Sequence, residues 1–478
     1  MIKQALSLLA AAFMTANMLL PVSAALSPET ESFIVESMEK DKAPGLSMVI
    51  IDGDDTEYHS FGYANIGKGI EADEYTIYEL GSTTKAFTAL AALILEDEGV
   101  IDLDADIREY VPWLTLTHDG APAVITCSQL MSHTAGIPDK YYPDAIVGDD
   151  HDIMRRTAEL INGKELDFAP GERFSYSNLG YDLLGYIIDL KCGTTYEDLV
   201  TERILRPLGM EHSGFHLETA QGYRLCFTFN TEYDAPRYQG SLPDGYLETC
   251  AADMVLWLKA QMGIGENVPE QLERLIIRSH SFTDAVCSDE DDEDTQYYSC
   301  GWMVSSGRLT HSGGNPNFTS DIDIFPEEKR AVCAISNSSA YAPILATVAV
   351  SRTWHGKALP QAEGATLPSD MIMSAAALVI ALLTIFTVVG LFTMKKRLSG
   401  KTYSKPRKNL RLAAGIIISL IFIAADPLLV LMTGYSVTGA ISSLWVWMPV
   451  SASVLALELP LFGILLLISS VRRRTLLE

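Results

Sequence analysis

The stretch YELGSTTKAFTALAALILEDEGV (Tyr78–Val100) decides the fold of this 478-residue chain. A strand-like run ends at a turn glycine, Gly81, and an apolar helix is predicted from Lys85 to Glu98. Ser82 therefore lies near unpaired backbone N–H groups and the positive end of that helix. Residues three apart share one helix face, so Lys85 can reach the Ser82 hydroxyl. The stretch predicts a serine nucleophile with a lysine beside it.

Two shorter strings follow in a fixed order. YSN (Tyr176–Asn178) supplies a tyrosine for proton transfer, and HSG (His311–Gly313) supplies a strand edge that can hold a substrate. Serine at its ordinary pKa is a weak nucleophile and needs a base nearby. Together with Ser82 and Lys85, these strings predict acyl transfer through a serine ester.

Each string also occurs a second time, so only its context can separate the copies. A second SxxK, Ser37–Lys40, lies in a charged stretch, Glu29–Lys42, that predicts a solvated surface helix. A second YxN, Tyr63–Asn65, lies in a strand-like alternation before Ser82. A second HxG, His212–Gly214, follows a predicted helix end and loop. Only Ser82 opens an apolar helix, and it is therefore the predicted nucleophile.

Longer strings along the chain resemble the serine β-lactamases and penicillin-binding proteins, above all class C. They are YELGSTTKAFTALAALILEDEGVIDLDADIREYVP (Tyr78–Pro112), LMSHTAGIP (Leu130–Pro138), PGERFSYSNLGYDLLGYII (Pro170–Ile188), RPLGM (Arg206–Met210) and HSGGNPNFTSDIDIFPEEKRAVCAISNSS (His311–Ser339). The resemblance runs from about Glu29 to Gly356. It implies an α/β (α+β) fold, in which an antiparallel sheet is flanked by helices and a helical lobe, with the site between them.

The resemblance also implies the roles of the site residues. Ser82 attacks the substrate carbonyl, and Lys85 and Tyr176 share the proton transfers. Either of these two can be the base for acylation: a charged lysine favours the tyrosine anion, and burial favours a neutral lysine. Asn178 orients Lys85 and binds a substrate amide, and backbone N–H groups of Ser82 and Gly314 form the oxyanion hole. The other expected substrate-binding residues are His311, Ser312, Gly313 and Asn315.

His311 bears on the class of substrate. Penicillin-directed relatives often carry a lysine here, whose fixed charge meets a substrate carboxylate. A histidine is mostly neutral at pH 7. The sequence therefore favours an amidase, aminopeptidase or esterase over a β-lactamase or a carboxypeptidase that acts on free carboxylates.

The pattern of the first 355 residues predicts one sheet built from both ends of the domain. The predicted strands are Gly45–Ile51, Tyr58–Tyr63, Tyr298–Val304, Gly307–His311, Phe318–Phe325 and Ala331–Asn337. The predicted helices are Lys85–Glu98, Ile153–Ile161, Asn178–Leu190, Tyr196–Leu205 and Ile344–His355.

The last quarter of the chain predicts membrane spans. Three apolar runs are long enough to cross a bilayer: Met371–Met394, Leu412–Thr433 and Leu444–Ser470. Basic residues fill the loop 395–411 and follow the third span at 472–474, so the positive-inside rule places both in the cytoplasm. The uncharged loop Gly434–Ser443 then lies outside.

The N-terminal residues 1–24 contain Lys3, an apolar run and a small-residue end, which together predict a signal peptide. Residues 25–355 then form an extracytoplasmic domain, and 356–370 a linker to the spans. This placement agrees with the one that the basic loops give. The expected location is a bacterial cytoplasmic membrane, with the catalytic domain on its periplasmic or cell-surface side.

Charge and cysteine content narrow the partners. From residue 371 onward there are 11 basic and 3 acidic residues, against 24 basic and 58 acidic ones before it, which argues against nucleic acid. The acidic run Asp289–Asp294 predicts a solvated loop, because it lacks the spacing and glycine of a calcium loop. Seven cysteines without a CxxC or Cys/His cluster argue against zinc. No metal or cofactor is expected, and whether Cys287 pairs with Cys300 stays open.

A domain of this kind followed by three spans is similar to the membrane-bound D-amino-acid peptidases that activate prodrugs, such as the colibactin-maturing type. The strings that carry this resemblance are YELGSTTKAFTAL (Tyr78–Leu90), HSGGNPNF (His311–Phe318) and LWVWMPVSASVLALELPLFGILLL (Leu444–Leu467). It implies a small-molecule or peptide substrate that is N-acylated on a D-residue, typically D-asparagine. By analogy Asn178, Glu248 and Asn315 recognise the substrate amide. Serine and histidine are expected at the first two positions, so the preference for D-asparagine stays open.

Several alternatives remain at this point. The function is a D-amino-acid peptidase, a cell-wall penicillin-binding protein or β-lactamase-like enzyme, an esterase, or a non-catalytic membrane sensor. The intact Ser82, Lys85 and Tyr176 disfavour the sensor. Asp426 and Glu458 lie within apolar runs, where a charge is costly, so they form either a polar seam or acyl-chain cleft, or a packing and kink feature. The oligomeric state stays open.

Overall fold

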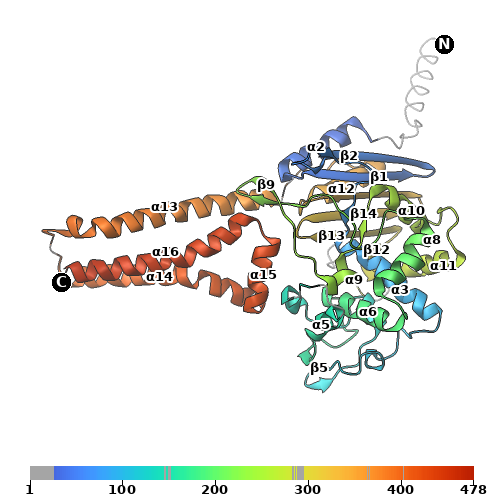
Figure 1. Ribbon diagram of the computed structural model, residues 1–478, viewed down its shortest axis with the longest axis horizontal. Helices are drawn as coiled ribbons and strands as arrows, with labels where there is room; N and C mark the ends of the chain where they lie inside the picture. Colours follow the sequence, from blue (N-terminus) through green and yellow to red (C-terminus); the bar gives the residue numbers. More distant parts are fainter. Residues whose placement is uncertain are drawn as a thin grey trace, which may run out of the picture.

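The structure is a computed structural model that describes residues 26–144, 147–148, 152–281, 285, 287, 295–362, 364, 366–401 and 403–477. The predicted signal peptide and the acidic run Asp289–Asp294 lie outside the described residues. The chain forms two parts, a head of sheet and helices and a bundle of long helices that extends from it (Figure 1). The predicted fold, an antiparallel sheet flanked by helices and followed by three long apolar helices, is confirmed.

The main sheet of the head joins the two ends of the domain. Its eight strands lie in the order β11-β12-β13-β14-β15-β1-β2-β3, with antiparallel neighbours. Their bounds are β1 (Gly45–Asp52), β2 (Asp55–Asn65), β3 (Ile70–Glu71), β11 (Tyr297–Ser299), β12 (Trp302–Ser305), β13 (Arg308–Asn315), β14 (Phe318–Phe325) and β15 (Arg330–Ser336). The single predicted strand Tyr298–Val304 is wrong, because the chain reverses at Cys300 and Gly301, which both have positive φ.

Both faces of the sheet are covered, because successive residues of a strand point to opposite sides. Met48 and Ile50 of β1 join one core with α2 (Pro28–Asp41) and α12 (Ala342–Trp354). Val49 and Ile51 join the other. Helices on that second face include α3 (Lys85–Asp97), α10 (Ala251–Gln261) and α11 (Glu270–Ser279).

The prediction of a solvated surface helix over Glu29–Lys42 is wrong for one face of α2. Ser37 is buried and its hydroxyl donates to the Phe33 carbonyl, whereas Lys40 is exposed and pairs with Glu36 at 2.8 Å. The many charged residues of this segment obscured, in the sequence, the apolar face of α2 that packs on α12. This second SxxK therefore has a structural role in helix packing.

The helical lobe lies beside the sheet (Figure 1), and the turn that carries Ser82 contacts both β13 and a helix of the lobe. Its elements include η1 (Gly81–Thr84), α4 (Cys127–Met131), η3 (Asp139–Asp144), α5 (Ile153–Glu159), α6 (Asn178–Lys191), α7 (Tyr196–Val200), η5 (Gln239–Ser241) and α9 (Leu242–Gly245). The predicted helix Tyr196–Leu205 changes from α to π winding after Val200. All seven cysteines are free thiols, so Cys287 and Cys300 are not paired.

Three helices of the bundle are long and apolar enough to cross a membrane: α13 (Thr366–Leu398), α14 (Lys405–Thr433) and α16 (Val450–Leu477). The predicted start of the third span at Leu444 is wrong, because Met448 is extended and a separate helix, α15 (Val437–Trp447), precedes it. The predicted loop Gly434–Ser443 is therefore mostly helix, capped by Ser436.

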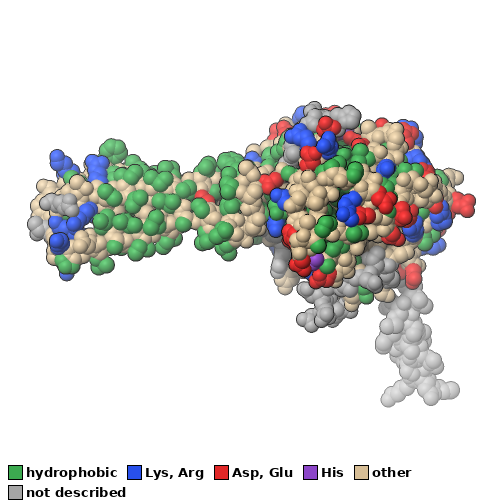
Figure 2. Space-filling view, turned by 90° about the horizontal axis from the view of Figure 1, so that it is seen from below, with side chains coloured by type: hydrophobic (Ala, Val, Ile, Leu, Met, Phe, Trp, Pro, Cys, Tyr) green, Lys and Arg blue, Asp and Glu red, His purple; other side chains and the backbone are tan. Residues whose placement is uncertain are grey.

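Apolar and basic side chains occupy different parts of the bundle surface. Hydrophobic side chains cover its length, and lysines and arginines gather at the end far from the head (Figure 2). These basic residues belong to the end of α13, the start of α14 and the end of α16. The bundle thus has an apolar belt and one basic end, as a membrane domain requires.

Candidate active site

Glycines bring strand β13 against the turn that carries Ser82. Gly81 has a φ of +59°, and a Cβ built on it would lie 2.4 Å from the backbone nitrogen of Gly314. A Cβ on Gly313 would lie 2.0 Å from the Leu80 carbonyl oxygen. Only glycine fits such approaches. The contact extends β13 past the predicted end at His311 and brings the Gly314 nitrogen to the serine turn, where the oxyanion hole is predicted.

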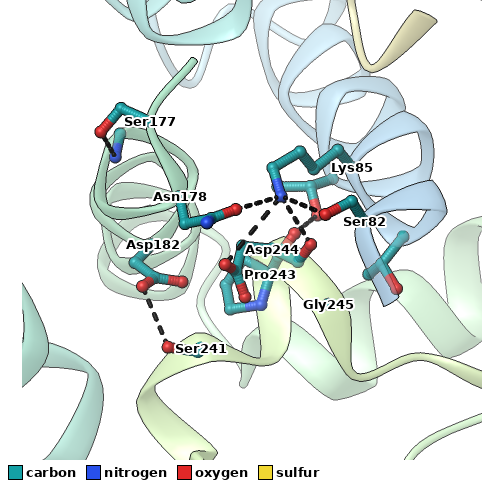
Figure 3. A network of polar contacts seen from close by, with 12 residues as sticks. Ser82, Lys85, Ser177, Asn178, Asp182, Ser241, Pro243, Asp244 and Gly245 are labelled. Carbon is teal, nitrogen blue, oxygen red and sulfur yellow. Dashed lines mark hydrogen bonds and ion pairs between the residues drawn. The ribbon is translucent and has the colours of Figure 1, made fainter. Parts of the chain in front are cut away.

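Lys85 is the centre of the polar contacts in the site (Figure 3). Its Nζ donates to Ser82 Oγ at 3.2 Å, to Asn178 Oδ1 at 2.8 Å and to the Asp244 carbonyl at 2.8 Å. The side chain is fully buried. Three acceptors therefore fix the ammonium group beside the serine. The predicted orienting role of Asn178 agrees with this geometry.

The pKa values of Lys85 and Tyr176 describe the resting site. Burial lowers the pKa of Lys85, but Tyr176, Asp244 and Asp182 together raise it above its ordinary value. Burial raises the pKa of Tyr176, and Lys85 and Ser82 offset only part of this. These directions favour a charged Lys85 and a neutral Tyr176 in the resting site.

Aromatic packing positions Tyr176. Its ring lies 4.2 Å from the His133 ring and 5.0 Å from Lys85 Nζ. Its hydroxyl is near enough to Ser82 and Lys85 for both to lower its pKa. It nevertheless forms no hydrogen bond of acceptable geometry with any residue in the described part of the chain. His133 Nδ1 accepts from the Ser177 backbone N–H at 3.2 Å. The motif LMSHTAGIP thus contributes a ring that the sequence did not identify as a site residue.

Two buried carboxyl groups and a half-buried one lie near Lys85, and sequence reasoning missed all three. Asp244 Oδ2 is 3.9 Å from Lys85 Nζ, and burial raises its pKa to about 7. Asp182 accepts from Ser241 Oγ at 3.0 Å, and Asp139 accepts from the Asn178 N–H at 2.7 Å. Burial raises the pKa of both. Asp182 lies in the motif Pro170–Ile188, but Asp244 lies in none of the motifs and comes near Asp182 only in the folded chain.

The side chain of His311 is neutral, and both of its ring nitrogens have hydrogen-bond partners. It is buried, Tyr298 Oη lies 3.0 Å from its Nε2, and its Nδ1 lies 2.6 Å from the Ser312 carbonyl. Burial, followed by the charge of Lys85, lowers the pKa of His311 to about 4. Ser312 Oγ in turn donates to Asp321 at 2.6 Å. His311 therefore presents no fixed positive charge at this strand position.

A second polar network surrounds Asn315. Its Nδ2 donates to Glu79 Oε2 at 2.6 Å and to the Gly245 carbonyl at 2.9 Å. Arg237 forms an ion pair with Glu248 and lies 3.5 Å from Glu79. Glu248 and Glu79 are paired residues of the short strands β10 (Glu248–Thr249) and β4 (Tyr78–Glu79). The predicted Asn315 and Glu248 thus lie in one network, with Glu79 and Arg237 as members that the sequence missed.

The second copies of the other two strings lie in other roles. Tyr63 is partly exposed in β2, where Asn65 Oδ1 accepts from the Lys68 N–H. His212 Nδ1 lies 3.1 Å from Asp253. Sequence context therefore identified the copies of the motifs that the fold assembles around Lys85.

Comparisons with known proteins show the family of this chain. The Beta-lactamase family profile matches residues 30–351. Protein flp of Staphylococcus aureus (strain MRSA252) is 29% identical over 327 residues, which are 66% of this chain and 64% of flp. Penicillin-binding protein 4* of Bacillus subtilis (strain 168) is 26% identical over 320 residues, 63% of this chain and 69% of that protein. The chain thus spans less than two thirds of the length of flp.

Solved structures extend the likeness to the fold. The octameric penicillin-binding protein homologue from Pyrococcus abyssi has a TM-score of 0.61 and 29% identity, covering 72% of this chain and 80% of its own. A class C beta-lactamase has a TM-score of 0.57 and 19% identity, and the match covers 68% of this chain and 95% of the beta-lactamase chain. The second likeness shows the fold alone. This chain belongs to the beta-lactamase family, whose related penicillin-binding and class C members are serine hydrolases that act through an acyl-enzyme.

Proposed function

We propose that this chain is a membrane-anchored serine amidase that cleaves an amide bond beside an N-acylated D-residue, outside the cytoplasmic membrane. The observation that carries the amide part is His311. It is buried, neutral and already bonded to Tyr298, so it offers no charge to a substrate carboxylate. A substrate whose scissile bond is followed by an amide or amine group fits this strand edge better than one ending in a free carboxylate.

The network around Asn315 supports recognition of a polar side chain. Both amide hydrogens of Asn315 are held by Glu79 and Gly245, which fixes the plane of the amide and leaves its oxygen as the acceptor for a substrate N–H. Glu79 and Glu248 are buried and share one cation, Arg237. This network can bind amide donors of a substrate residue. The D-configuration and the N-acyl group rest on the resemblance to prodrug-activating peptidases.

The charge distribution supports the extracytoplasmic placement. The basic end of the bundle lies far from the head (Figure 2), and basic residues prefer the cytoplasmic side. We expect trypsin added to intact spheroplasts to degrade the head while the basic loop 395–411 stays uncut. Cleavage within 395–411 before the membrane is permeabilised would reverse the proposed orientation.

A substrate panel tests the proposed activity. The full chain in nanodiscs is given N-acetyl-D-asparagine, N-acetyl-L-asparagine and N-acetyl-D-alanine anilides, a simple ester and a D-alanyl-D-alanine peptide, with Ser82→Ala as the control. We expect wild type alone to release the N-acetyl-D-residue, with kcat/KM at least about 100-fold above that for the L-isomer. Turnover of the ester without any amide would contradict the proposal and indicate an esterase.

One other function has a specific observation in its favour. The curated relative Penicillin-binding protein 4* and the Pyrococcus abyssi homologue are both named for penicillin binding. A cell-wall D,D-peptidase is therefore the second candidate. In the same panel it predicts a preference for the D-alanyl-D-alanine peptide, whose free carboxylate His311 is not suited to bind.

A further inference from the structure

The hairpin of β8 (Tyr223–Cys226) and β9 (Phe229–Glu232) belongs to the head but lies where the head meets the membrane bundle. Figure 1 shows β9 beside the head-side end of α13. Strand β8 also contacts α13 and α16. Cys226 pairs with Phe229, so the turn between the strands has only two residues, Phe227 and Thr228. The three residues 227–229 form the hairpin tip.

The residue types of the hairpin tip do not suit its backbone. Phe227 and Thr228 have φ values of +49° and +69°. Two-residue hairpin turns with positive φ at both positions favour Asn-Gly, and bulky or β-branched residues are strained there. Strained residues of this kind persist where other contacts hold the backbone, and they cluster at functional positions. The contacts of the hairpin tip outside the hairpin therefore bear on its role.

Two helices of the bundle hold the hairpin tip. The Thr228 N–H donates to Asp370 Oδ2 at 2.6 Å, and Asp370 is fully buried near the start of α13. The other oxygen of Asp370 accepts from Oγ of Ser451, the second residue of α16. Both helices are long and apolar enough to cross a membrane. The hairpin tip is thus fixed at the head-side ends of both helices.

Apolar side chains of the hairpin tip are exposed. Phe229 is 73% exposed, the highest value among the large hydrophobic side chains in the described part of the head, and Phe227 is exposed as well. Met371 and Ile372, which directly follow Asp370, are also exposed and begin the apolar run of α13. Because Asp370 holds the residue next to Phe229, the exposed ring lies within about one to two helical turns of this run.

The end of α15 places two more exposed aromatic residues at this junction. Arg224 of β8 donates to the Trp445 carbonyl at 2.8 Å, and the Tyr233 hydroxyl, just after β9, donates to the Val446 carbonyl at 3.1 Å. The side chains of Trp445 and Trp447 are exposed. Aromatic side chains concentrate where a membrane protein meets the lipid–water boundary. Exposed aromatic residues of the hairpin and of α15 thus gather at the head-side end of the apolar bundle.

We propose that the hairpin tip inserts into the head-side surface of the phospholipid bilayer, with the Phe229 ring among the lipid chains just below the headgroups. The partner is lipid because the exposed apolar surface continues from Phe229 to Ile372 and along α13. Removal of the ring from water then offsets the strain of the turn. This contact is additional to the three spans, limits the tilt of the head relative to the bilayer, and does not depend on the substrate or on turnover.

Photocrosslinking tests the insertion of the hairpin tip. The photoreactive residue p-benzoylphenylalanine replaces Phe229 or, as the control, the exposed Ile277 of α11, a helix on the side of the head away from the bundle (Figure 1). The full chain is irradiated in phosphatidylcholine liposomes, and adducts are mapped by mass spectrometry. We expect at least about tenfold more phospholipid adducts at position 229 than at 277. Equal adducts at both positions, or none at either, would overturn the proposal. Adducts from position 229 to a second copy of the chain would also overturn it, because the hairpin tip would then be an interface between copies.

Fluorescence quenching tests the same contact without a photoreactive residue. Phe229→Trp and Ile277→Trp each add one indole to the six native tryptophans, whose contribution is the same in both variants. Each variant is reconstituted in phospholipid with and without bromine on the acyl chains. We expect bromine to quench a larger fraction of the emission in Phe229→Trp than in Ile277→Trp. Equal quenching in the two variants would overturn the proposal, because the ring at position 229 would then be no closer to lipid than one on α11. Neither experiment includes a substrate, so the outcome is independent of the proposed amidase activity.

Discussion

A buried ionisable group has hydrogen-bond partners around Lys85 but lacks them within the described part of the membrane bundle. Lys85 is fully buried but makes three hydrogen bonds and has Asp244, Asp182 and Asp139 near it. In the bundle, the buried Oε2 of Glu458 has no partner in the described part of the chain. A buried charge is tolerated when opposite charges and hydrogen bonds compensate it. The comparison teaches that the head contains the reactive chemistry, and that the bundle provides an apolar setting for it.

The largest effect should come from removing the charge at the centre of the head. Lys85→Met keeps the length of the side chain but removes the donor to Ser82 and Asn178. We expect kcat/KM to fall by roughly 10³–10⁴-fold, as for other residues that act as a unit with a nucleophile. The matched control is Lys40→Met in the second SxxK, an exposed lysine, which should change kcat/KM less than twofold. A comparable loss in both variants would break the assignment.

The next effect concerns pH. Burial raises the pKa of Asp244 to about 7 from an ordinary 3.8, so the folded state binds more protons than the unfolded state between these pH values. Stability therefore falls as pH rises from about 4 to 7. Asp244→Asn should remove its share of this fall, up to about 4 kcal/mol at roughly 1.4 kcal/mol per pKa unit. The check is chemical denaturation of the full chain at pH 4.5 and 7.5.

The same variant has a kinetic signature. Without the negative charge of Asp244, burial should lower the pKa of Lys85, and the basic limb of the kcat/KM profile should shift to lower pH. Asp321→Asn is the control, because the pKa of Asp321 is also raised to about 7 by burial, but it bonds Ser312 and Thr347 instead of Lys85. An equal shift of the limb in both variants would show that the carboxyl group acts only through stability.

A smaller effect is expected at the strand edge. His311→Lys places a positive charge where the wild type has a neutral ring, so a substrate with a free carboxylate should gain about tenfold in kcat/KM. His311→Gln keeps the position neutral and should show no such gain. Competition between the D-alanyl-D-alanine peptide and N-acetyl-D-alanine anilide measures the ratio directly. No change of that ratio in the lysine variant would mean that His311 does not select the substrate.

The smallest effect tests how the two regions are joined. Asp370 is buried at the start of α13, bonds Ser451 and accepts from the Thr228 N–H at 2.6 Å. Asp370→Asn should weaken this docking by about 1–3 kcal/mol. Hydrogen exchange should rise at the β8 (Tyr223–Cys226) and β9 (Phe229–Glu232) hairpin while kcat for the acetyl substrate changes less than twofold. A large loss of kcat would instead make the bundle part of the catalytic unit.

Sequence reasoning predicted the features that short motifs encode. The turn at Gly81, the helix after Ser82 and the antiparallel sheet follow from local pattern and resemblance. It missed Asp244, Arg237 and Glu79 as site residues, because their roles depend on contacts between residues far apart in the chain. It also missed α15, because an uncharged stretch between spans does not distinguish a loop from an interfacial helix.

The most direct test of the account is to capture the acyl-enzyme. Wild type in nanodiscs is mixed with N-acetyl-D-alanine anilide or a fluorophosphonate and quenched in acid, and peptides are mapped by mass spectrometry. The account predicts that the acyl or phosphonyl group is on Ser82, that Ser82→Ala loses it, and that Ser37→Ala keeps it. Modification of another serine, or none with full anilide turnover, would contradict the claim that Ser82 and Lys85 form the reactive centre.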